Sequence, residues 1–189
     1  MGLYTDVIIA GFGGQGVLLV GNLLAYAAMK KGLQVTYMPV YGVEMRGGTA
    51  NCTVVISEQE IGSPLVMYPQ SLIIMNQPSL EKFQPRLREG GIQIVNTSIV
   101  PQSMLNSHTN SCVPLPANNL ANDLGNPKMA NMVVLGAWVK ATGVLDLEEI
   151  KEVLPLALGK SDKRIIEANH RAMQAGADRV GGLAYSGQE

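Results

Sequence analysis

The chain has 189 residues, enough for one domain with a sizeable core, and its net charge at pH 7 is −1. Charged residues make up only 15% of it, against roughly 25% in typical soluble domains, so part of its surface is weakly polar and suited to a partner. It has no conspicuous run of Lys or Arg and no apolar run of the roughly 18 residues that a membrane span needs. These features argue against nucleic acid and membranes as partners.

The start of the chain, MGLYTDVIIAG, lacks the basic segment and the cleavage site of a signal peptide. The two cysteines, Cys52 and Cys112, stand apart and form no CxxC motif. An iron–sulfur cluster or a structural zinc site is therefore not expected in this chain. The default expectation is a reduced, cytoplasmic setting.

The N-terminal segment predicts a strand, a turn and a helix. Residues 6–10 (DVIIA) are a short apolar run that predicts a buried strand, and residues 11–16 (GFGGQG) predict a turn. Residues 17–31 predict a helix that ends at Gly32. This helix is apolar on nearly every side, so we expect its outer side to be covered as well.

The following segments predict an α/β fold. Residues 34–39, 51–57, 71–75 and 92–96 are expected strands, and residues 78–88 are an expected short helix. Alternation of strands and helices implies parallel pairing with right-handed crossovers. We therefore expect a three-layer α/β/α domain around a mainly parallel, Rossmann-like sheet.

The middle of the chain is less regular. Residues 100–126 are polar and contain several prolines, and they predict an irregular excursion with one short strand near residues 111–115. Residues 128–142 again predict a largely apolar helix. No linker or repeat divides the chain, so one domain over residues 1–180 and a flexible tail over residues 181–189 are expected.

Two further helices are expected near the C-terminus. Asp146 and Glu149 have the D-x-x-E spacing of a capping box, and Pro155 should end or bend the helix that they begin. Residues 163–177 show the periodicity of an amphipathic helix.

The turn after the first strand is a candidate ligand site. Gly11, Gly13 and Gly16 satisfy G-x-G-x-x-G, and Gly14 and Gln15 lie between them. Glycine permits a tight turn and close approach of a ligand, and the helix start offers free N–H groups to an anion. Three interpretations stay open: a dinucleotide site, a turn that only packs the helix on the sheet, and a site for a phosphate-bearing ligand or a partner loop.

The dinucleotide interpretation has a specific weakness. NAD binding needs an acidic residue at the end of the second strand, where it holds the ribose. That strand ends Tyr37-Met38-Pro39, without an acid and without an arginine for a 2′-phosphate.

A second glycine-bearing segment, YGVEMRGG, starts at Tyr41. It lies at the same sheet edge as the glycine turn if the two preceding strands are parallel, which makes Tyr41, Glu44, Arg46 and Gly47 candidate binding residues. Glu44 and Arg46 are two residues apart and point the same way in an extended chain. They can pair with each other, or they can hold a partner chain or a polar ligand.

The combination of GFGGQG with YGVEMRGG about 30 residues later resembles the gamma subunit of 2-oxoacid:acceptor oxidoreductases. Residues 131–136 (NMVVLG) and 169–176 (NHRAMQAG) match two further motifs of that family. The resemblance runs from about residue 3 to about residue 177. One departure is Val43, where the family often carries proline.

The resemblance implies a reaction that this chain shares with other subunits. In the family, a 2-oxoacid is decarboxylated on thiamine diphosphate, electrons pass through iron–sulfur clusters to ferredoxin, and the acyl group passes to coenzyme A. This sequence contains no GDG thiamine motif and no cysteine cluster. The resemblance therefore implies alpha and beta partner subunits, with a delta subunit as a further candidate, that carry thiamine diphosphate and the clusters.

The resemblance also implies a role for the gamma chain itself: it lies against the thiamine-binding subunits and helps to position coenzyme A, a co-substrate. No catalytic residue, metal ligand or tightly bound cofactor is expected here. The expected cofactor-binding residues are the two glycine-bearing segments and one helical amide, namely Gly11, Gly13, Gly14, Gln15, Gly16, Tyr41, Glu44, Arg46, Gly47 and Asn131. The alternatives are a stand-alone dinucleotide-binding oxidoreductase and a ligand-free scaffold subunit.

Several single residues have ordinary structural interpretations. His108 and His170 lack a second ligand at metal-binding spacing, so structural roles are favoured for both. Cys52 alternates with apolar residues and belongs in the core, and Cys112 has no identifiable base nearby. Asn131 on an apolar helix needs hydrogen-bond partners if buried, so it either ties down a loop or contacts a ligand.

Overall fold

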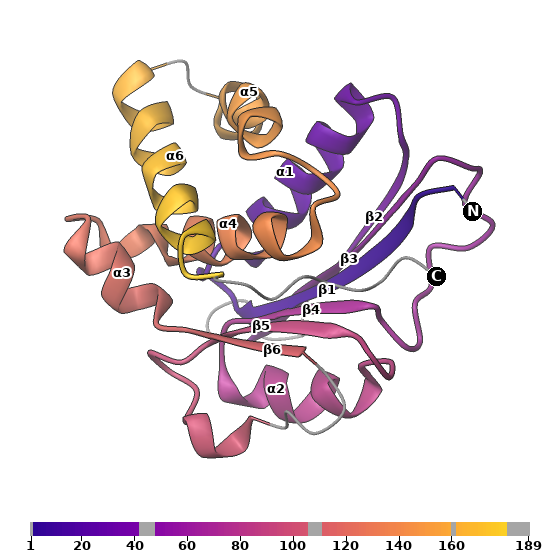
Figure 1. Ribbon diagram of the computed structural model, residues 1–189, viewed down its shortest axis with the longest axis horizontal. Helices are drawn as coiled ribbons and strands as arrows, with labels where there is room; N and C mark the ends of the chain where they lie inside the picture. The colour runs from indigo at the N-terminus through magenta and orange to yellow at the C-terminus, as the bar shows by residue number, and fades with distance from the viewer. Residues whose placement is uncertain (1, 42–47, 106–110, 160–161, 181–189) are drawn as a thin grey trace.

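The computed structural model describes residues 2–41, 48–105, 111–159 and 162–180, and in this part the chain forms one six-stranded sheet with helices on both faces (Figure 1). The spatial order of the strands is β2-β3-β1-β4-β5-β6. Their bounds are β1 (Tyr4–Phe12), β2 (Gln34–Tyr41), β3 (Thr49–Ser57), β4 (Ser71–Ile74), β5 (Ile92–Asn96) and β6 (Ser111–Leu115). The proposed tail, residues 181–189, lies outside the described residues.

The sheet is mainly parallel, as the sequence predicts. β1, β4, β5 and β6 pair in parallel, whereas β3 pairs antiparallel with both β1 and β2. No helix of the described chain separates β2 from β3, so the chain reverses there and pairs as antiparallel neighbours do. β1 and β2 consequently run in the same direction, but β3 lies between them.

The helices form the two outer layers. α1 and α4 cover one face of the sheet, with α5 and α6 outside them, while α2 covers the other face (Figure 1). The helix bounds are α1 (Val17–Lys30), α2 (Gln77–Phe83), α3 (Ala117–Asp123), α4 (Ala130–Thr142), α5 (Leu147–Leu158) and α6 (Lys163–Ala177). Short 3-10 helices are η1 (Gln84–Arg86), η2 (Gln102–Met104) and η3 (Pro127–Met129). The expected three-layer α/β/α architecture is confirmed.

Two helix predictions need correction. α3 lies inside the stretch that was expected to be irregular. The sequence does not predict this helix because its several asparagines have low helix propensity. Ser98 Oγ compensates by accepting the N–H groups of Asn118 and Asn119 at 3.1 and 3.3 Å. In α5 the expected capping box is present, and of the two outcomes expected at Pro155 only an end of the helix is wrong, because the helix continues to Leu158.

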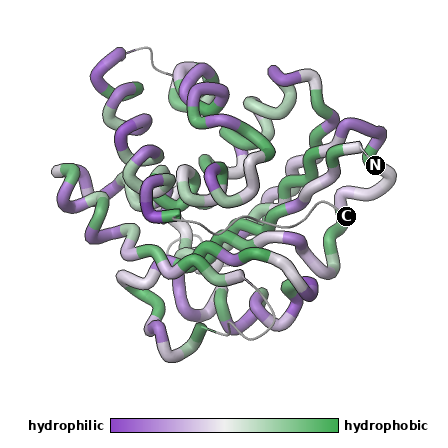
Figure 2. Tube along the Cα trace, viewed as in Figure 1, coloured by the Kyte–Doolittle hydropathy of each residue, from purple (hydrophilic) through white to green (hydrophobic). Residues whose placement is uncertain are grey.

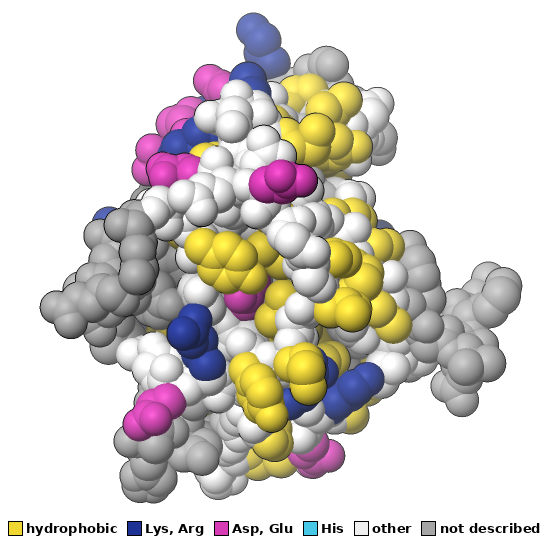
Figure 3. All heavy atoms as spheres, turned by 90° about the vertical axis from the view of Figure 1, so that its right-hand side faces the viewer, with side chains coloured by type: hydrophobic (Ala, Val, Ile, Leu, Met, Phe, Trp, Pro, Cys, Tyr) yellow, Lys and Arg dark blue, Asp and Glu magenta, His cyan; other side chains and the backbone are white. Residues whose placement is uncertain are grey.

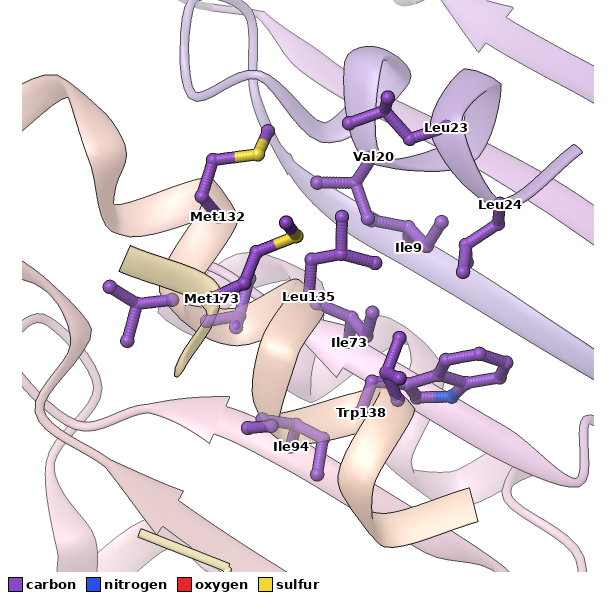
Figure 4. Close-up of a cluster of buried hydrophobic side chains, with 14 of the residues drawn as sticks. Ile9, Val20, Leu23, Leu24, Ile73, Ile94, Met132, Leu135, Trp138 and Met173 are labelled. Atoms are coloured by element: carbon purple, nitrogen blue, oxygen red, sulfur yellow. The ribbon is translucent and has the colours of Figure 1, made fainter. Parts of the chain in front are cut away.

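The hydrophobic core lies between the sheet and the α1–α4 layer. Apolar residues follow the central strands and the inner helices (Figure 2), and the close-up shows Leu135 and Trp138 of α4 beside Ile73 and Ile94 of the sheet (Figure 4). The indole Nε1 of Trp138 donates to Ser71 Oγ at 2.9 Å, so its single polar group is satisfied. α1 is covered on its outer side by α5, as its all-round apolar sequence predicts.

α4 and α6 cross at unusually short range because both carry glycine at the crossing. A methyl group on Gly136 would overlap the backbone of Met173, with its Cα at 2.6 Å. A methyl group on Gly176 would overlap the backbone of Val133 and lie 3.1 Å from the nitrogen of Ala137. The two late motifs of the sequence therefore have a packing role at this crossing.

Asp6 is a buried carboxyl group near the start of β1, and burial raises its pKa above the ordinary 3.8. The Gln70 N–H donates to Oδ1 at 2.7 Å and Arg88 lies near, and both lower the pKa by smaller amounts. Because folding favours the protonated form, the contribution of Asp6 to stability is greatest below pH 3.8 and is lost as the pH rises through the raised pKa.

We therefore expect Asp6→Asn to raise the free energy of unfolding at pH 7. The amide oxygen still accepts the Gln70 N–H, and the buried charge is gone. Urea denaturation measured from pH 7 downward tests this, and the advantage of the variant should shrink toward pH 3.8. A variant less stable than the parent at pH 7 would show that Arg88 outweighs burial.

Candidate functional site

The two glycine-bearing segments meet at the carboxyl edge of the parallel strands. Phe12 at the end of β1 pairs with Thr49, and the N–H of Gly13 donates to the carbonyl of Gly48 at 2.9 Å. The end of β2 is at the same edge, since Tyr41 pairs with Ala50. The expected proximity is thus confirmed for the residues that bound the second segment. Three of its candidate residues, Glu44, Arg46 and Gly47, lie outside the described residues.

Gln15, a candidate ligand residue, ties the glycine turn to the sheet. Its Oε1 accepts the N–H of Phe12 at 2.7 Å, and its Nε2 donates to the carbonyl of Met75 at 3.2 Å. The amide of Asn76 also donates to Oε1, at 3.4 Å. These bonds give Gln15 a structural function in shaping the turn.

Different physical constraints favour glycine at the individual positions of the turn. A methyl group on Gly11 would meet Gln15 Oε1 at 2.6 Å and Met75 Cβ at 2.8 Å, so this position is closed by packing. Gly14 and Gly16 have φ angles of 93° and 76°, which favour glycine. Gly14 differs from Gly11 and Gly16 because a methyl group there would have no atom of the described residues within 4 Å. Among these three glycines, Gly14 is thus the open position with respect to the described part of the chain.

The N-terminus of α1 follows this turn and has no side-chain cap. Gly16 is its N-cap residue, and the first intrahelical bond runs from the N–H of Val20 to the Gly16 carbonyl at 3.1 Å. The first turn contains no acidic residue. The N–H groups before Val20 have no acceptor within the helix. Together with the helix dipole they provide partial positive charge at the sheet edge, which suits an anion.

Asn131 in the first turn of α4 is placed against this helix end. A methyl group on Gly16 would contact the Asn131 Nδ2 first, then Cγ at 2.9 Å and Cβ at 3.3 Å, so the amide points tip-first at Gly16. Asn131 is a buried residue, with 7% of its surface exposed, yet within the described part of the chain its side chain makes no hydrogen bond. Asn131 was expected either to tie down a loop or to contact a ligand. It forms no hydrogen bond that would tie down a described loop.

Two further polar residues, which no sequence motif described above includes, lie at this edge. Asn76 follows β4 and accepts the N–H of Ser79 at 2.9 Å, which caps α2. Asn96 ends β5 and accepts the N–H of Ala117 at 3.2 Å while donating to Asn118 at 2.9 Å. The signal that could have found them is an asparagine at or just beyond the carboxyl end of each of these buried parallel strands.

The two cysteines and His170 lie in surroundings that fit structural roles. Cys52 is fully buried on β3, where burial raises its pKa to about 12, and burial raises the pKa of Cys112 to about 11. His170 pairs with Glu148, with Nε2 and Oε1 3.0 Å apart, and His108 lies outside the described residues. Over the ranges that the structure describes, no group of three His, Cys, Asp or Glu residues has the arrangement of a metal site.

In those same ranges, no helix has the length and apolar character needed to cross a membrane. The fold defines a Rossmann-like α/β domain with the glycine turn at the carboxyl edge of its parallel strands. A family model described as pyruvate ferredoxin/flavodoxin oxidoreductase matches residues 6–179. The chain belongs to this family.

Comparison with individual proteins agrees. The ketoisovalerate oxidoreductase subunit VorA of Methanothermobacter marburgensis is 41% identical over 174 residues, which are 91% of this chain and 36% of VorA. The chain thus spans about a third of the length of this relative.

Two solved structures share the fold. The gamma subunit of the keto/oxoacid ferredoxin oxidoreductase from Geobacter sulfurreducens has a TM-score of 0.80 and 28% identity, and the match covers 94% of this chain and 97% of that subunit. The 2-oxoglutarate:ferredoxin oxidoreductase from Magnetococcus marinus, solved with 2-oxoglutarate, coenzyme A and succinyl-CoA bound, has a TM-score of 0.86 over 97% of this chain and 32% of that one. Its identity is 22%, so this second likeness concerns the fold.

Proposed function

We propose that the chain is the gamma-type subunit of a 2-oxoacid:ferredoxin oxidoreductase, which converts a 2-oxoacid to an acyl-coenzyme A and reduces ferredoxin. Family membership over residues 6–179 and likeness to a gamma subunit over nearly its full length support this proposal. For the part played by this chain, the observation that carries most weight is the uncapped N-terminus of α1 at the carboxyl edge.

In this proposal the chain helps to position coenzyme A. The phosphates of coenzyme A meet the N–H groups of Gly13 to Val17, where the helix dipole favours negative charge. The coenzyme supplies the thiol that accepts the acyl group. The open space beside Gly14 and the absence of an acidic residue in the first turn of α1 support such an approach.

Thiamine diphosphate and the iron–sulfur clusters belong, in this proposal, to alpha and beta subunits, with a delta subunit as a further candidate. The chain has only two cysteines, and the raised pKa values of both thiols disfavour the thiolate form that clusters require. Both cysteines are free, which supports a reducing, cytoplasmic setting.

An exposed apolar surface supports the presence of partner subunits. Leu65, Met67 and Tyr68, between β3 and β4, expose 70%, 70% and 68% of their surface. The backbone beneath them is held by Arg86, which donates to the carbonyls of Val66 and Met67 at 2.8 and 2.9 Å. Hydrophobic side chains gather on this face of the molecule (Figure 3). An ordered backbone that presents apolar side chains to water is typical of an interface.

The proposal is tested by reconstitution. The purified chain alone is expected to show no 2-oxoacid oxidation, because the groups that carry decarboxylation and electron transfer belong to the partners. Co-expression with alpha and beta chains from the same genome should give coenzyme A-dependent ferredoxin reduction, followed optically with each of several 2-oxoacids. Omission of this chain from the co-expression is the control. Activity of the chain alone, or full activity of the partners without it, would overturn the proposal.

The geometry disfavours the dinucleotide alternative. In dinucleotide-binding folds the second strand lies next to the first, so that its end reaches the ribose. Here β3 separates β2 from β1, which moves the end of β2 about 5 Å further from the glycine turn. Calorimetry should accordingly detect no NAD(P) binding tighter than roughly 1 mM.

A further inference from the structure

The side of α1 that faces away from α4 carries an uncharged row of side chains. Val20, on the opposite side of the helix, packs toward Leu135 of α4 (Figure 4). The row has the spacing of one helix face, and its members are Leu18, Asn22, Tyr26 and Met29. The first two are half-buried, whereas Tyr26 and Met29 are exposed, Met29 by 61%. The cover of α5 over α1 thus leaves this row open.

The strand β2 continues the same surface. It is the last strand of the sheet on this side, so within the described chain no further strand pairs with its outer side. α1 and β2 lie side by side (Figure 1), and the hydroxyl of Tyr37 donates to the carbonyl of Leu18 at 3.3 Å. We call the row on α1 together with residues 34–40 of β2 the α1–β2 face.

The α1–β2 face carries no charge. Residues 17–29 and 34–41 contain no Asp, Glu, Lys or Arg. The nearest lysines are compensated within the chain, since Lys30 lies 2.7 Å from Glu152 and Lys31 lies 3.0 Å from Glu149. An edge strand that stays in water usually carries charged side chains, lysine above all, which prevent pairing with another chain. An uncharged edge beside an apolar row is instead typical of an interface.

The two edges of the sheet differ in how much strand they offer. Proline has no N–H group and interrupts a ladder of hydrogen bonds. β6 has five residues and its proline, Pro114, is the fourth of them. β2 has eight residues and its proline, Pro39, is the sixth. The longer uninterrupted run is therefore residues 34–38 of β2, with Thr36 at its centre.

We propose that the chain pairs with a second copy of itself across the α1–β2 face, through antiparallel β2 strands related by a two-fold axis at Thr36. Complementarity of charge argues for this occupant. A partner that covers an uncharged face must be uncharged there too, because it would otherwise bury an unpaired charge. The same face on a second copy meets this condition, and a two-fold axis makes it complementary to itself.

The proposed pairing also covers the exposed part of α1. A two-fold axis that relates neighbouring antiparallel strands is perpendicular to the sheet, so the two copies of α1 lie on the same side of a continuous sheet. Tyr26 and Met29 of one copy then approach those of the other. This inference goes beyond the proposed function, since it concerns the number of copies of this chain in one assembly.

Sedimentation equilibrium of the purified chain tests the proposal. The expected result is a reversible dimer with a Kd of roughly 10 µM or tighter. Met29→Lys places a charge in the face at an exposed position, so the variant should fold and its Kd for dimerisation should rise at least tenfold. Met67→Lys is the matched control, because Met67 is 70% exposed and lies between β3 and β4. A monomeric parent chain, or equal weakening by both variants, would overturn the proposal.

Thr36→Cys tests the position of the axis. Residues directly opposite each other in an antiparallel pair have Cα atoms about 4.5–5.5 Å apart, which suits a disulfide. Mild oxidation should therefore convert this variant to a covalent dimer on a non-reducing gel. Ser103→Cys, at another exposed position, is the control and should stay largely uncrosslinked. No more covalent dimer with Thr36→Cys than with Ser103→Cys would refute pairing through β2.

Discussion

Gly136→Ala is expected to lower the free energy of unfolding by about 3 kcal/mol or more, or to prevent folding. The added methyl group overlaps the backbone of Met173 on α6, with Cα at 2.6 Å, and a backbone cannot rotate away as a side chain can. Relief requires that α4 and α6 move apart. That movement opens the layer that covers Leu135 and Trp138 (Figure 4).

Urea denaturation of the variants measures this effect. Gly62→Ala is the matched control, because a methyl group there has no atom within 4 Å, and it should change stability by at most about 0.5 kcal/mol. Gly176→Ala on the facing helix should be as harmful as Gly136→Ala, and the double variant should cost less than the sum because one separation relieves both overlaps. If Gly136→Ala were as stable as Gly62→Ala, the close approach of the α4 and α6 backbones at Gly136 would be contradicted.

Gly14→Ala in the assembled complex is expected to raise the apparent KM for coenzyme A at least tenfold, about 1.4 kcal/mol, with 2-oxoacid decarboxylation nearly unchanged. Unlike Gly11 and Gly16, Gly14 has no described atom close to its side-chain position, so an added methyl group enters the space beside the N-terminus of α1. Gly11 and Gly16 are less informative positions, because substitution there also disrupts packing against Met75 and Asn131.

The control for Gly14→Ala separates the ligand from backbone strain. Gly32, after the C-terminal end of the same helix, has φ 84° and is equally open. Alanine at either position costs roughly 1–2 kcal/mol of conformational strain. Gly32→Ala should therefore match Gly14→Ala in stability and leave the KM for coenzyme A unchanged. An unchanged KM in both variants would leave the glycine turn with a packing role and would favour the ligand-free scaffold.

Local patterns in the sequence were sufficient for most individual elements. The apolar run before Gly11 predicts β1, the all-round apolar pattern predicts a helix buried on both sides at α1, and the Asp146–Glu149 spacing predicts the start of α5. Each of these features depends on residues a few positions apart, whose interactions the periodicity of a strand or helix already determines.

The sequence alone could not establish the direction of β3 or the existence of α3. The direction of a strand depends on which neighbour it pairs with, and β3 pairs with β1 from 37 or more residues away as well as with β2. α3 has weak local propensity and depends on Ser98, some 20 residues earlier, to accept its first N–H groups. In both cases a long-range hydrogen bond outweighs the local signal.

The candidate site divides in the same way. The sequence by itself determined that a glycine turn precedes α1 and that a second glycine-bearing segment returns to the same edge, since both follow from strand and helix order. Only the tertiary structure assigned the individual residues: Gln15 ties the turn to Met75, whereas Asn131 is buried against Gly16 and makes no hydrogen bond to a described residue. The physical reason is that the hydrogen bonds of a buried side chain depend on which groups the fold brings next to it. Here those groups are 60 to 115 residues away in the chain, so no local sequence pattern indicates them.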